Sequence, residues 1–317
     1  MGGYSSEVAI SLTSGSVVYK NLDITKYTPY SIHILQEKWV YIDRDKNEFP
    51  IDKNDFSVLI NGIKTTFDCV FNAIHGTPGE DGKILAYFDL IGLKHTSAPW
   101  YQMALTFNKR DTLSVIKHYG IPAATSIYLN KGDQIEPLKI IDTVGLPCFI
   151  KPNNAGSSFG ISKAYTADEI IAGIEKAYKE DSEILIESFL DGTEVSVGVI
   201  EYRGEVTVLP ITEITTDNDF FDYEAKYQGK SEEITPARIS EVAATKVREL
   251  AKKVYKILRM SGFSRSEYIF VNGEPHFLEM NSVPGLTEES LLPQQAKIAN
   301  ISLSDLFDNA IESALNT

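Results

Sequence analysis

The order of apolar and polar positions predicts three consecutive segments of helices and strands, the first of which reaches residue 107. Short apolar runs in this segment alternate with stretches in which apolar residues recur at helical spacing. The runs cover residues 31–35, 56–60 and 68–74, and the helical stretches cover 6–19 and 81–91. This alternation predicts a doubly wound α/β domain with a parallel sheet over residues 1–107.

The second segment, residues 108–190, combines helices and strands in a different order. The expected elements are a helix at 109–119, strands at 125–129 and 147–151, and a helix at 167–179. Thr166 and Glu169 have the spacing of a capping box. We therefore expect the second helix to begin directly after Thr166.

The third segment, residues 191–317, contains the longest predicted helix. Its expected elements are strands at 194–201 and 206–210, a helix at 239–260, a hairpin at 265–281 and a helix at 303–315. One face of the long helix is apolar, through Ala243, Val247, Leu250, Val254 and Ile257. That face should pack against the strands of this segment.

Composition narrows the class of protein. With 317 residues, of which 43% are hydrophobic, the chain can bury a sizeable core. Its 44 acidic and 30 basic residues give a net charge of −14, the wrong sign for a surface that binds nucleic acid. We expect neither a membrane span nor a signal peptide. Cys69 and Cys148 lie in apolar runs, as expected for a protein of the reducing cytoplasm.

A lysine at the end of a predicted strand precedes a loop of small residues. Lys151 is followed by Pro-Asn-Asn-Ala-Gly-Ser-Ser-Phe-Gly, and the backbone amides of such a loop can approach phosphate oxygens. The loop matches neither the P-loop nor the dinucleotide-binding glycine pattern. The residues alone leave two interpretations open, a phosphate-binding loop and an ordinary hairpin loop.

Two further polar stretches also allow two interpretations each. Glu187 and Glu194 flank a turn between strands, where they could bind a nucleotide's base and ribose or lie in solvent. The stretch that leads to Lys226 and Tyr227 lacks periodicity and predicts a long loop. Such a loop either closes over a substrate or is an exposed connection.

The last predicted hairpin has two alternative registers. Its Asn-Gly dipeptide marks a turn between apolar strands. A two-residue loop would point Glu267 and Glu279 to opposite faces of the sheet. A three-residue loop, 272–274, would pair Val271 with Pro275 and place Glu267 opposite Glu279. We expect the three-residue loop.

In that register four polar side chains share one face of the hairpin, namely Arg265, Glu267, Glu279 and Asn281. Adjacent carboxylates repel unless a cation separates them, and two carboxylates with an amide suit Mg²⁺ that carries phosphates. Ile269 and Phe277 are expected on the same face, which would bury it. The alternative interpretation is a charge ladder on an exposed edge hairpin.

Seven motifs occur in the order of one known family. They are Gly2-Gly3-Tyr-Ser-Ser-Glu7, the stretch 75–82, Asn108-Lys109, the loop 151–160, the stretch 187–194, the stretch 222–227 and the stretch 278–285. On these motifs the chain resembles the D-alanine–D-alanine ligase family of the ATP-grasp superfamily. The resemblance implies an N-terminal Rossmann-like domain, 1–107, and two ATP-grasp subdomains, 108–190 and 191–317.

The resemblance also implies which residues bind ATP and metal. Phosphates would meet Lys109, Lys151, Ser157, Ser158 and Lys226, adenine would meet Glu187 and the backbone of Leu190, and the ribose would meet Glu194. The implied metal ligands are Glu267, Glu279 and Asn281, which would hold two Mg²⁺ ions, with Mn²⁺ as a substitute. The metal site would belong to the third segment.

For the substrates, the resemblance implies one set of residues for each D-alanine molecule. Glu7, helped by His75, would hold the ammonium group of the first D-alanine. Arg265 and the Gly285 amide would receive the developing oxyanion. Ser290 would contact the carboxylate of the second D-alanine. Ser157, Lys226 and Tyr227 complete the implied catalytic set.

The implied activity is ATP-dependent formation of D-alanyl-D-alanine through an acyl phosphate, for peptidoglycan precursors, in an enzyme that could be a homodimer. Two rivals are a ligase that joins D-alanine to D-lactate or D-serine, and a truncated, non-catalytic nucleotide-binding protein. Ligases that make the D-lactate product tend to lose the lysine and tyrosine found at Lys226 and Tyr227.

The chain departs from the family's pattern at a few positions. Glu267 stands where the family usually has Asp, Phe221 where it has a hydroxyl-bearing aromatic residue, and Ser188 where it has lysine. The family also has a β-strand immediately before the position of Gly2. We therefore expect an apolar strand before Gly2, so that the first strand of the domain is missing from this chain.

Overall fold

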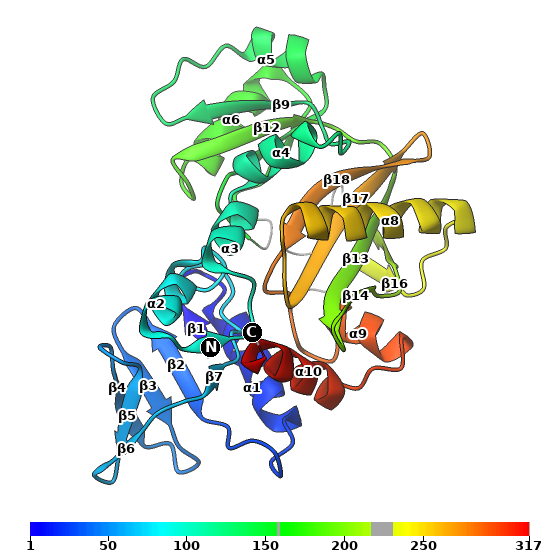
Figure 1. Ribbon diagram of the computed structural model, residues 1–317. Helices are drawn as coiled ribbons and strands as arrows, with labels where there is room; N and C mark the ends of the chain where they lie inside the picture. Colours follow the sequence, from blue (N-terminus) through cyan, green and yellow to red (C-terminus); the bar gives the residue numbers. More distant parts are fainter. Residues whose placement is uncertain (157–158, 217–230, 317) are drawn as a thin grey trace.

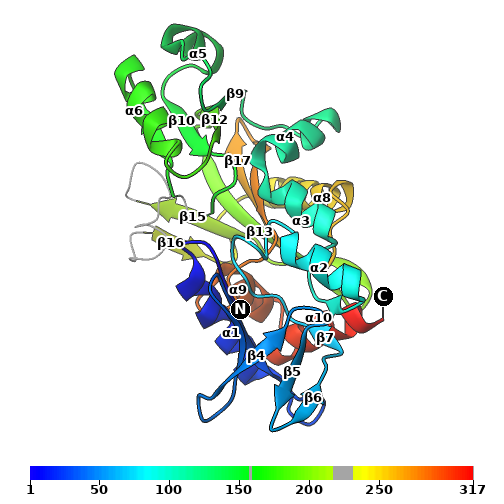
Figure 2. The same cartoon turned by 90° about the vertical axis from the view of Figure 1, so that its left-hand side faces the viewer.

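The computed structural model describes residues 1–316 except 157–158 and 217–230. In this part of the chain the strands form three larger sheets and one two-stranded pair (Figures 1 and 2). Each larger sheet takes its strands from one of the three predicted segments. The mixed α/β class predicted from the sequence is confirmed.

The first sheet has the order β1-β2-β3-β4-β5-β6. Its strands are β1 (Gly2–Gly3), β2 (Ser31–Leu35), β3 (Trp39–Ile42), β4 (Glu48–Asp52), β5 (Ser57–Ile60) and β6 (Ile63–Thr65). β1 pairs with β2 in parallel, whereas the other neighbours are antiparallel. The prediction of a parallel sheet is therefore wrong for most of this segment.

Short turns explain the difference. Asn61 and Gly62, with φ values of 49° and 81°, join β5 directly to β6, and a two-residue connection can link only antiparallel strands. In the described chain, the other parallel pair is β7 (Cys69–Val70) with β8 (Lys94–His95). The helices of the segment are α1 (Val8–Asn21), α2 (Lys83–Ile91) and α3 (Trp100–Phe107). Of these, α3 is absent from the sequence prediction.

A cavity of about 690 Å³ lies between β2 and β7. Ile32 and Ile34 line it from β2, Val70 from β7, and Met1 from the start of the chain. The Met1 amino group is buried and donates to the Ile32 carbonyl at 3.1 Å, and burial lowers its pKa to about 5. The strand expected before Gly2 stays a prediction.

The second sheet is antiparallel, in the order β11-β10-β12-β9. Its strands are β9 (Ser126–Asn130), β10 (Cys148–Pro152), β11 (Ser162–Ala164) and β12 (Glu183–Ser188). The helices of this segment are α4 (Lys109–His118), α5 (Pro137–Val144) and α6 (Ala167–Ala177). Thr166 caps α6 by accepting from the Glu169 amide, as predicted. Buried isoleucines of α6, β10 and β12 form the core of this segment.

The third sheet has the order β16-β15-β13-β17-β18, with β14 paired to β13. Its strands are β13 (Thr193–Tyr202), β14 (Glu205–Val208), β15 (Thr212–Thr216), β16 (Ser231–Ile234), β17 (Phe263–Val271) and β18 (Glu274–Asn281). The later helices are α8 (Glu241–Ile257), α9 (Leu291–Ile298) and α10 (Leu303–Leu315). None of the described helices is long and apolar enough to cross a membrane.

Helix α8 lies across one face of this sheet (Figure 1). Val247 and Val254 are buried as predicted, whereas Ala243, Leu250 and Ile257 are only partly buried. The buried face of α8 is completed by Ala244, Ala251 and Tyr255. The buried face of α8 is therefore rotated about the helix axis relative to the predicted apolar face. It packs on strands that include β13 and β17.

The β17–β18 hairpin turns through two residues, so the predicted three-residue loop is wrong. Val271 pairs with Glu274, and Asn272 and Gly273 both have positive φ, 50° and 78°. Two successive residues with positive φ form the type I′ turn that suits the twist of a hairpin, and Asn-Gly is its preferred sequence.

A β-bulge nevertheless produces the predicted pairing of the carboxylates. The register shifts by one residue between Glu267 and Tyr268, and Leu278 is the extra residue on β18. Glu267 therefore lies opposite Glu279, as predicted, and by the same shift the prediction that Arg265 lies opposite Asn281 is confirmed.

The bulge overturns one detail of the prediction. Phe277 pairs with Tyr268, and their ring centroids are 5.9 Å apart. Successive residues of a strand point to opposite faces, so Phe277 shares the face of Tyr268 and not that of Glu267. Both aromatic rings are buried in the core that includes α8.

Candidate active site

A buried ion pair joins two neighbouring strands of the second sheet. The Lys151 Nζ lies 2.8 Å from the Glu187 Oε2, and the two residues are 9% and 3% exposed. Burial by itself lowers the pKa of Lys151, but the nearby carboxylates of Glu187, Glu279 and Glu194 raise it above its ordinary value. Lys151 therefore stays charged and can receive an anionic group.

Lys109 brings a second cation to the same region. It is the first residue of α4, and its Nζ donates to the Ala155 carbonyl at 2.6 Å. The same Nζ lies 3.8 Å from the Glu279 Oε2 on β18. Lys109 thus lies between the loop after β10 and the end of β18, and it links the predicted phosphate residues to the predicted metal residues.

Arg265 and Glu267 form another buried ion pair, on β17. The Arg265 Nη1 lies 2.5 Å from the Glu267 Oε1 and 3.1 Å from the Ser196 Oγ. Burial lowers the pKa of Arg265, but the carboxylates of Glu267 and Glu279 raise it above its ordinary value. Arg265 is thereby held as a fixed cation beside the paired carboxylates.

The predicted metal ligands fit a divalent cation. Glu267 is 2% exposed and lies opposite Glu279. The Asn281 Oδ1 is buried without a hydrogen-bond partner in the described chain, and a buried acceptor of this kind is costly unless something binds it. No group of three His, Cys, Asp or Glu side chains among the described residues suits a metal ion. In the predicted set, the Asn281 oxygen would be the third ligand beside the two carboxylates.

Two buried carboxylates of the first segment, Glu7 and Glu80, interact electrostatically, and Glu7 lies next to the loop after β10. Glu7 is buried at the start of α1, and a Cβ built on Gly156 would lie only 2.9 Å from the Glu7 Oε2. The Glu80 carboxylate accepts from the amides of Gly76 at 2.8 Å and Val283 at 3.4 Å. Burial and the negative charge of Glu7 raise the pKa of Glu80 to about 8.

Glu80 is a residue that sequence reasoning missed. It belongs to the motif at 75–82, but no spacing rule connects it with Glu7, and its contact with Val283 joins the first segment to the third. Its position next to a carboxylate predicted to bind an ammonium group could be recognised only in three dimensions.

The ring of His75 contacts Ser14, and no described hydrogen bond of the ring reaches Glu7. The Ser14 Oγ lies 3.1 Å from the His75 Nε2 and also accepts from the Leu286 amide at 3.3 Å. Burial lowers the pKa of His75 to about 4, so the ring is neutral at pH 7. Through Ser14, His75 is linked to the segment that carries Gly285.

Gly285 and Ser290 lie together after β18. A Cβ built on Gly285 would lie 2.7 Å from the Ser290 Oγ, which is itself 2.8 Å from the Thr287 Oγ1. Ser290 occupies the N-cap position of α9 without capping it through its side chain. Its hydroxyl therefore points toward the Gly285 backbone instead of the helix.

The remaining predicted nucleotide residues lie around the turn between β12 and β13. Leu190 is in this turn, and Glu194 is on β13, opposite Ile269. Sequence reasoning missed Lys163, whose Nζ lies 4.3 Å from the centre of the Phe189 ring. This cation and aromatic ring lie at the same end of the second sheet as Glu187, which pairs with Phe149.

Several predicted residues cannot be located. Ser157, Ser158, Phe221, Lys226 and Tyr227 lie outside the described residues. The described site therefore contains two lysines, the paired carboxylates with Asn281, and Arg265.

Together, the three sheets and this set of charged residues are those of an ATP-grasp ligase. The chain belongs to the D-ala D-ala ligase family: the model of the family's N-terminus matches residues 1–98, and that of its C-terminus matches residues 115–312. It is an enzyme of this ligase family.

Proteins with established names support the assignment. The D-alanine–D-alanine ligase of Flavobacterium johnsoniae is 68% identical over 99% of this chain and 98% of its own length. That of Christiangramia forsetii is 59% identical over 100% of this chain and 97% of its own length.

Two solved structures resemble this one over nearly their whole length. The VanG D-Ala:D-Ser ligase of Enterococcus faecalis is 31% identical, with a TM-score of 0.86 over 98% of this chain and 97% of that chain. The D-alanine–D-alanine ligase of Bacillus anthracis complexed with ATP is 26% identical, with a TM-score of 0.78 over 100% of this chain and 95% of that chain.

Proposed function

We propose that this enzyme joins two molecules of D-alanine at the expense of ATP and so makes D-alanyl-D-alanine for peptidoglycan precursors. Relatives that share 68% and 59% of its residues have this activity in their names. The observation that carries the proposal is the position of Lys109, whose Nζ lies 3.8 Å from Glu279 and 2.6 Å from the Ala155 carbonyl. It joins a candidate phosphate site to a candidate metal site.

A carboxylate is a poor acylating agent, so the first D-alanine must be activated. Transfer of the terminal phosphoryl group of ATP to its carboxylate gives an acyl phosphate and ADP. Lys109 and Lys151 would neutralise the phosphates. Divalent ions held by Glu267, Glu279 and Asn281 would supply further positive charge. Glu187, Leu190 and Glu194 are proposed to bind the adenosine.

The second step forms the peptide bond. The amine of the second D-alanine attacks the acyl carbon, and phosphate leaves. Arg265 and the Gly285 amide are proposed to stabilise the oxyanion that develops. Glu7, near His75, would hold the ammonium group of the first D-alanine, and Ser290 the carboxylate of the second.

The proposal extends to residues outside the described part of the chain. Ser157 and Ser158 would cover the phosphates, and Lys226 and Tyr227 would close the site against water, which would otherwise hydrolyse the acyl phosphate. The same proposal includes four further properties. The domain boundaries lie at 107 and 190, and the enzyme is a homodimer. It uses two Mg²⁺ ions, with Mn²⁺ as a substitute, and is located in the cytoplasm.

A second candidate is a ligase that joins D-alanine to D-serine. The 31% identity and TM-score of 0.86 with the VanG D-Ala:D-Ser ligase keep this candidate open. It differs from the first only in the second substrate, so product analysis separates the two.

The test is to incubate the purified enzyme with ATP, Mg²⁺ and D-alanine, alone or with D-serine or D-lactate, and to measure ADP and products. We expect ADP release to require D-alanine and to match D-alanyl-D-alanine in amount. D-alanyl-D-serine as the main product would establish the second candidate, and a product that contains D-lactate would identify the D-lactate ligase instead. ADP release at the same rate with and without D-alanine would contradict both candidates. No ADP release at all would also contradict both, and would favour a non-catalytic nucleotide-binding protein.

A further inference from the structure

The side chain of Asn153 joins the two elements that carry Lys109 and Lys151. Asn153 is 0% exposed and follows β10 directly. Its Oδ1 accepts from the Arg110 amide at 2.9 Å, and its Nδ2 donates to the Glu183 Oε2 at 2.8 Å. Both ends of the amide are therefore used, and its orientation is determined.

The backbone of Asn153 makes the same connection. Its carbonyl accepts from the Lys109 amide at 3.4 Å, and its amide donates to the Glu183 carbonyl at 2.9 Å. The start of α4 is thus bound to the end of β10 through one residue. Because Lys151 lies only two positions before Asn153, these hydrogen bonds fix the backbones of Lys109 and Lys151 relative to each other.

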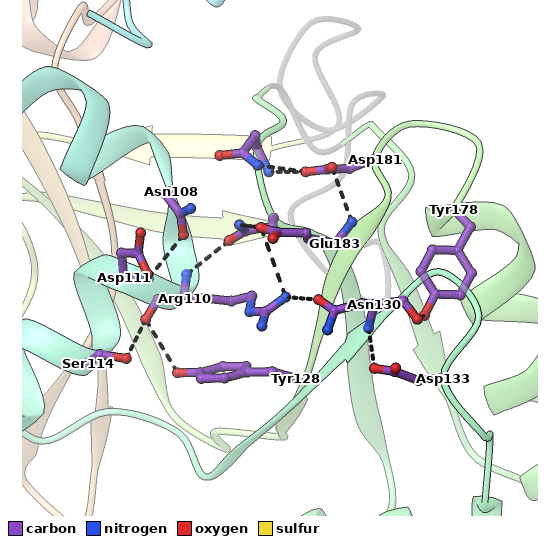
Figure 3. A network of polar contacts seen from close by, with 12 residues as sticks. Asn108, Arg110, Asp111, Ser114, Tyr128, Asn130, Asp133, Tyr178, Asp181 and Glu183 are labelled. Carbon is purple, nitrogen blue, oxygen red and sulfur yellow. Dashed lines mark hydrogen bonds and ion pairs between the residues drawn. The ribbon is translucent and has the colours of Figure 1, made fainter.

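The side chain of Arg110 also approaches Asn130 and Glu183 (Figure 3). The Arg110 Nη1 donates to the Asn130 Oδ1 at 2.8 Å and lies 3.9 Å from the Glu183 Oε2. Its guanidinium lies 4.9 Å from the centre of the Tyr128 ring. The arginine fixes the carboxylate that orients the amide of Asn153.

The first backbone amides of α4 are already hydrogen-bonded within the protein. The amides of Lys109 and Arg110 donate to Asn153, and that of Asp111 donates to the Asn108 Oδ1. A helix N-terminus can bind phosphate only through free amides. In this enzyme the start of α4 would therefore bind phosphate through the Lys109 ammonium group and not through its backbone amides.

We propose that Asn153 is a positioning residue for ATP: it sets the distance between the Lys109 and Lys151 ammonium groups, and Glu183 and Arg110 hold its amide in the required orientation. This inference rests on the proposed function, in which both lysines meet the ATP phosphates. Loss of the Asn153 side chain would let α4 shift relative to β10, which would weaken ATP binding while the D-alanine residues stay in place.

The first test compares Asn153→Ala with Asn154→Ala as a matched control. Asn154 contacts Asp181, through its backbone amide at 2.7 Å and its side chain at 2.8 Å, in an exposed turn. We expect Asn153→Ala to raise KM for ATP about ten-fold or more, with KM for D-alanine unchanged within about two-fold. Asn154→Ala should leave both constants within about two-fold. An equal rise in both constants for Asn153→Ala, or no change in either, would overturn the proposal.

A second test remains informative if Asn153→Ala does not fold. Asn153→Asp places a carboxylate against Glu183 and should weaken ATP binding. Adding Glu183→Gln restores a hydrogen bond between the two side chains, in which the new amide at 183 donates to the new carboxylate at 153. The double variant has the same net charge as the parent, and the carboxylate at 153 still accepts from the Arg110 amide. We expect the double variant to recover most of the affinity for ATP, and no recovery would contradict the proposed orientation of the amide.

ATP binding measured by calorimetry without D-alanine separates this proposal from the proposed function. If the parent enzyme binds ATP but makes no dipeptide, the proposed function fails, and the binding series still tests Asn153. If the parent makes dipeptide and all variants bind ATP equally well, the role of Asn153 is wrong and the proposed function stands.

Discussion

Glu267 lies directly opposite Glu279 across the β17–β18 hairpin, although the two-residue turn of that hairpin would by itself place them on opposite faces. The extra residue, Leu278, shifts the register by one between the turn and the carboxylates. The bulge therefore brings together two carboxylates that a regular hairpin would separate. Bulges of this kind commonly re-aim side chains next to functional sites.

The first prediction concerns this pair. Glu267→Gln retains size and shape but removes one charge, so it should raise the Mg²⁺ concentration needed for half-maximal ADP release by about ten-fold or more. Glu267→Asp, the residue usual in the family, should retain most of the activity. An unchanged Mg²⁺ dependence of Glu267→Gln, measured beside the parent and the Asp variant, would show that Glu267 is not a ligand.

The second prediction concerns the pH dependence of stability. The pKa of Glu80 is raised to about 8 in the folded protein from an ordinary value of 4.5. The folded state therefore binds more protons than the unfolded state between these values, so this group's contribution to stability falls as pH rises from about 5 to 8.

Melting temperatures of the parent and of Glu80→Gln over this pH range provide the measurement. The variant has no titrating group at position 80. The melting temperature of the parent should therefore fall relative to that of the variant as pH rises. Two parallel curves would mean that the Glu80 carboxyl titrates alike in the folded and unfolded states.

The third prediction uses the close approach of Gly156 to Glu7. A methyl group at position 156 would lie 2.9 Å from the Glu7 Oε2, the flexible end of a side chain that can move away. We therefore expect Gly156→Ala to change the melting temperature little and to raise KM for the first D-alanine several-fold. KM for ATP is the internal control, and a rise confined to ATP would contradict the predicted role of Glu7.

The fourth prediction concerns the cavity between β2 and β7. An apolar strand of about six residues added before Met1 should fill part of its 690 Å³ and remove the buried terminal amino group. Each apolar side chain buried in this way contributes about 1.5 to 3 kcal/mol. The extended chain should melt at a clearly higher temperature.

An extension of equal length with alternating lysine and glutamate is the control for this comparison. It removes the buried terminal amino group but cannot enter an apolar cavity at low cost. Equal melting temperatures of the apolar extension and the parent would mean that the cavity does not accept a strand.

Local patterns in the sequence determined where many elements begin and end. The apolar run at 31–35 and the periodic stretch at 303–315 coincide with β2 and α10, and α4 begins at the predicted Lys109. These features depend on residues within a few positions of one another, on capping and on periodicity, which any chain with the same local order would share. The motifs that carry the family resemblance are local in the same sense.

Only the tertiary structure decided how these elements combine. The bulge that pairs Glu267 with Glu279 occurs where Phe277 donates to the Pro122 carbonyl at 2.7 Å, a contact between distant parts of the chain. The orientation of Asn153 likewise depends on Arg110 and Glu183, which belong to other elements. Such partners cannot be predicted from local spacing, because register and side-chain orientation are set by the free energy of packing the whole chain.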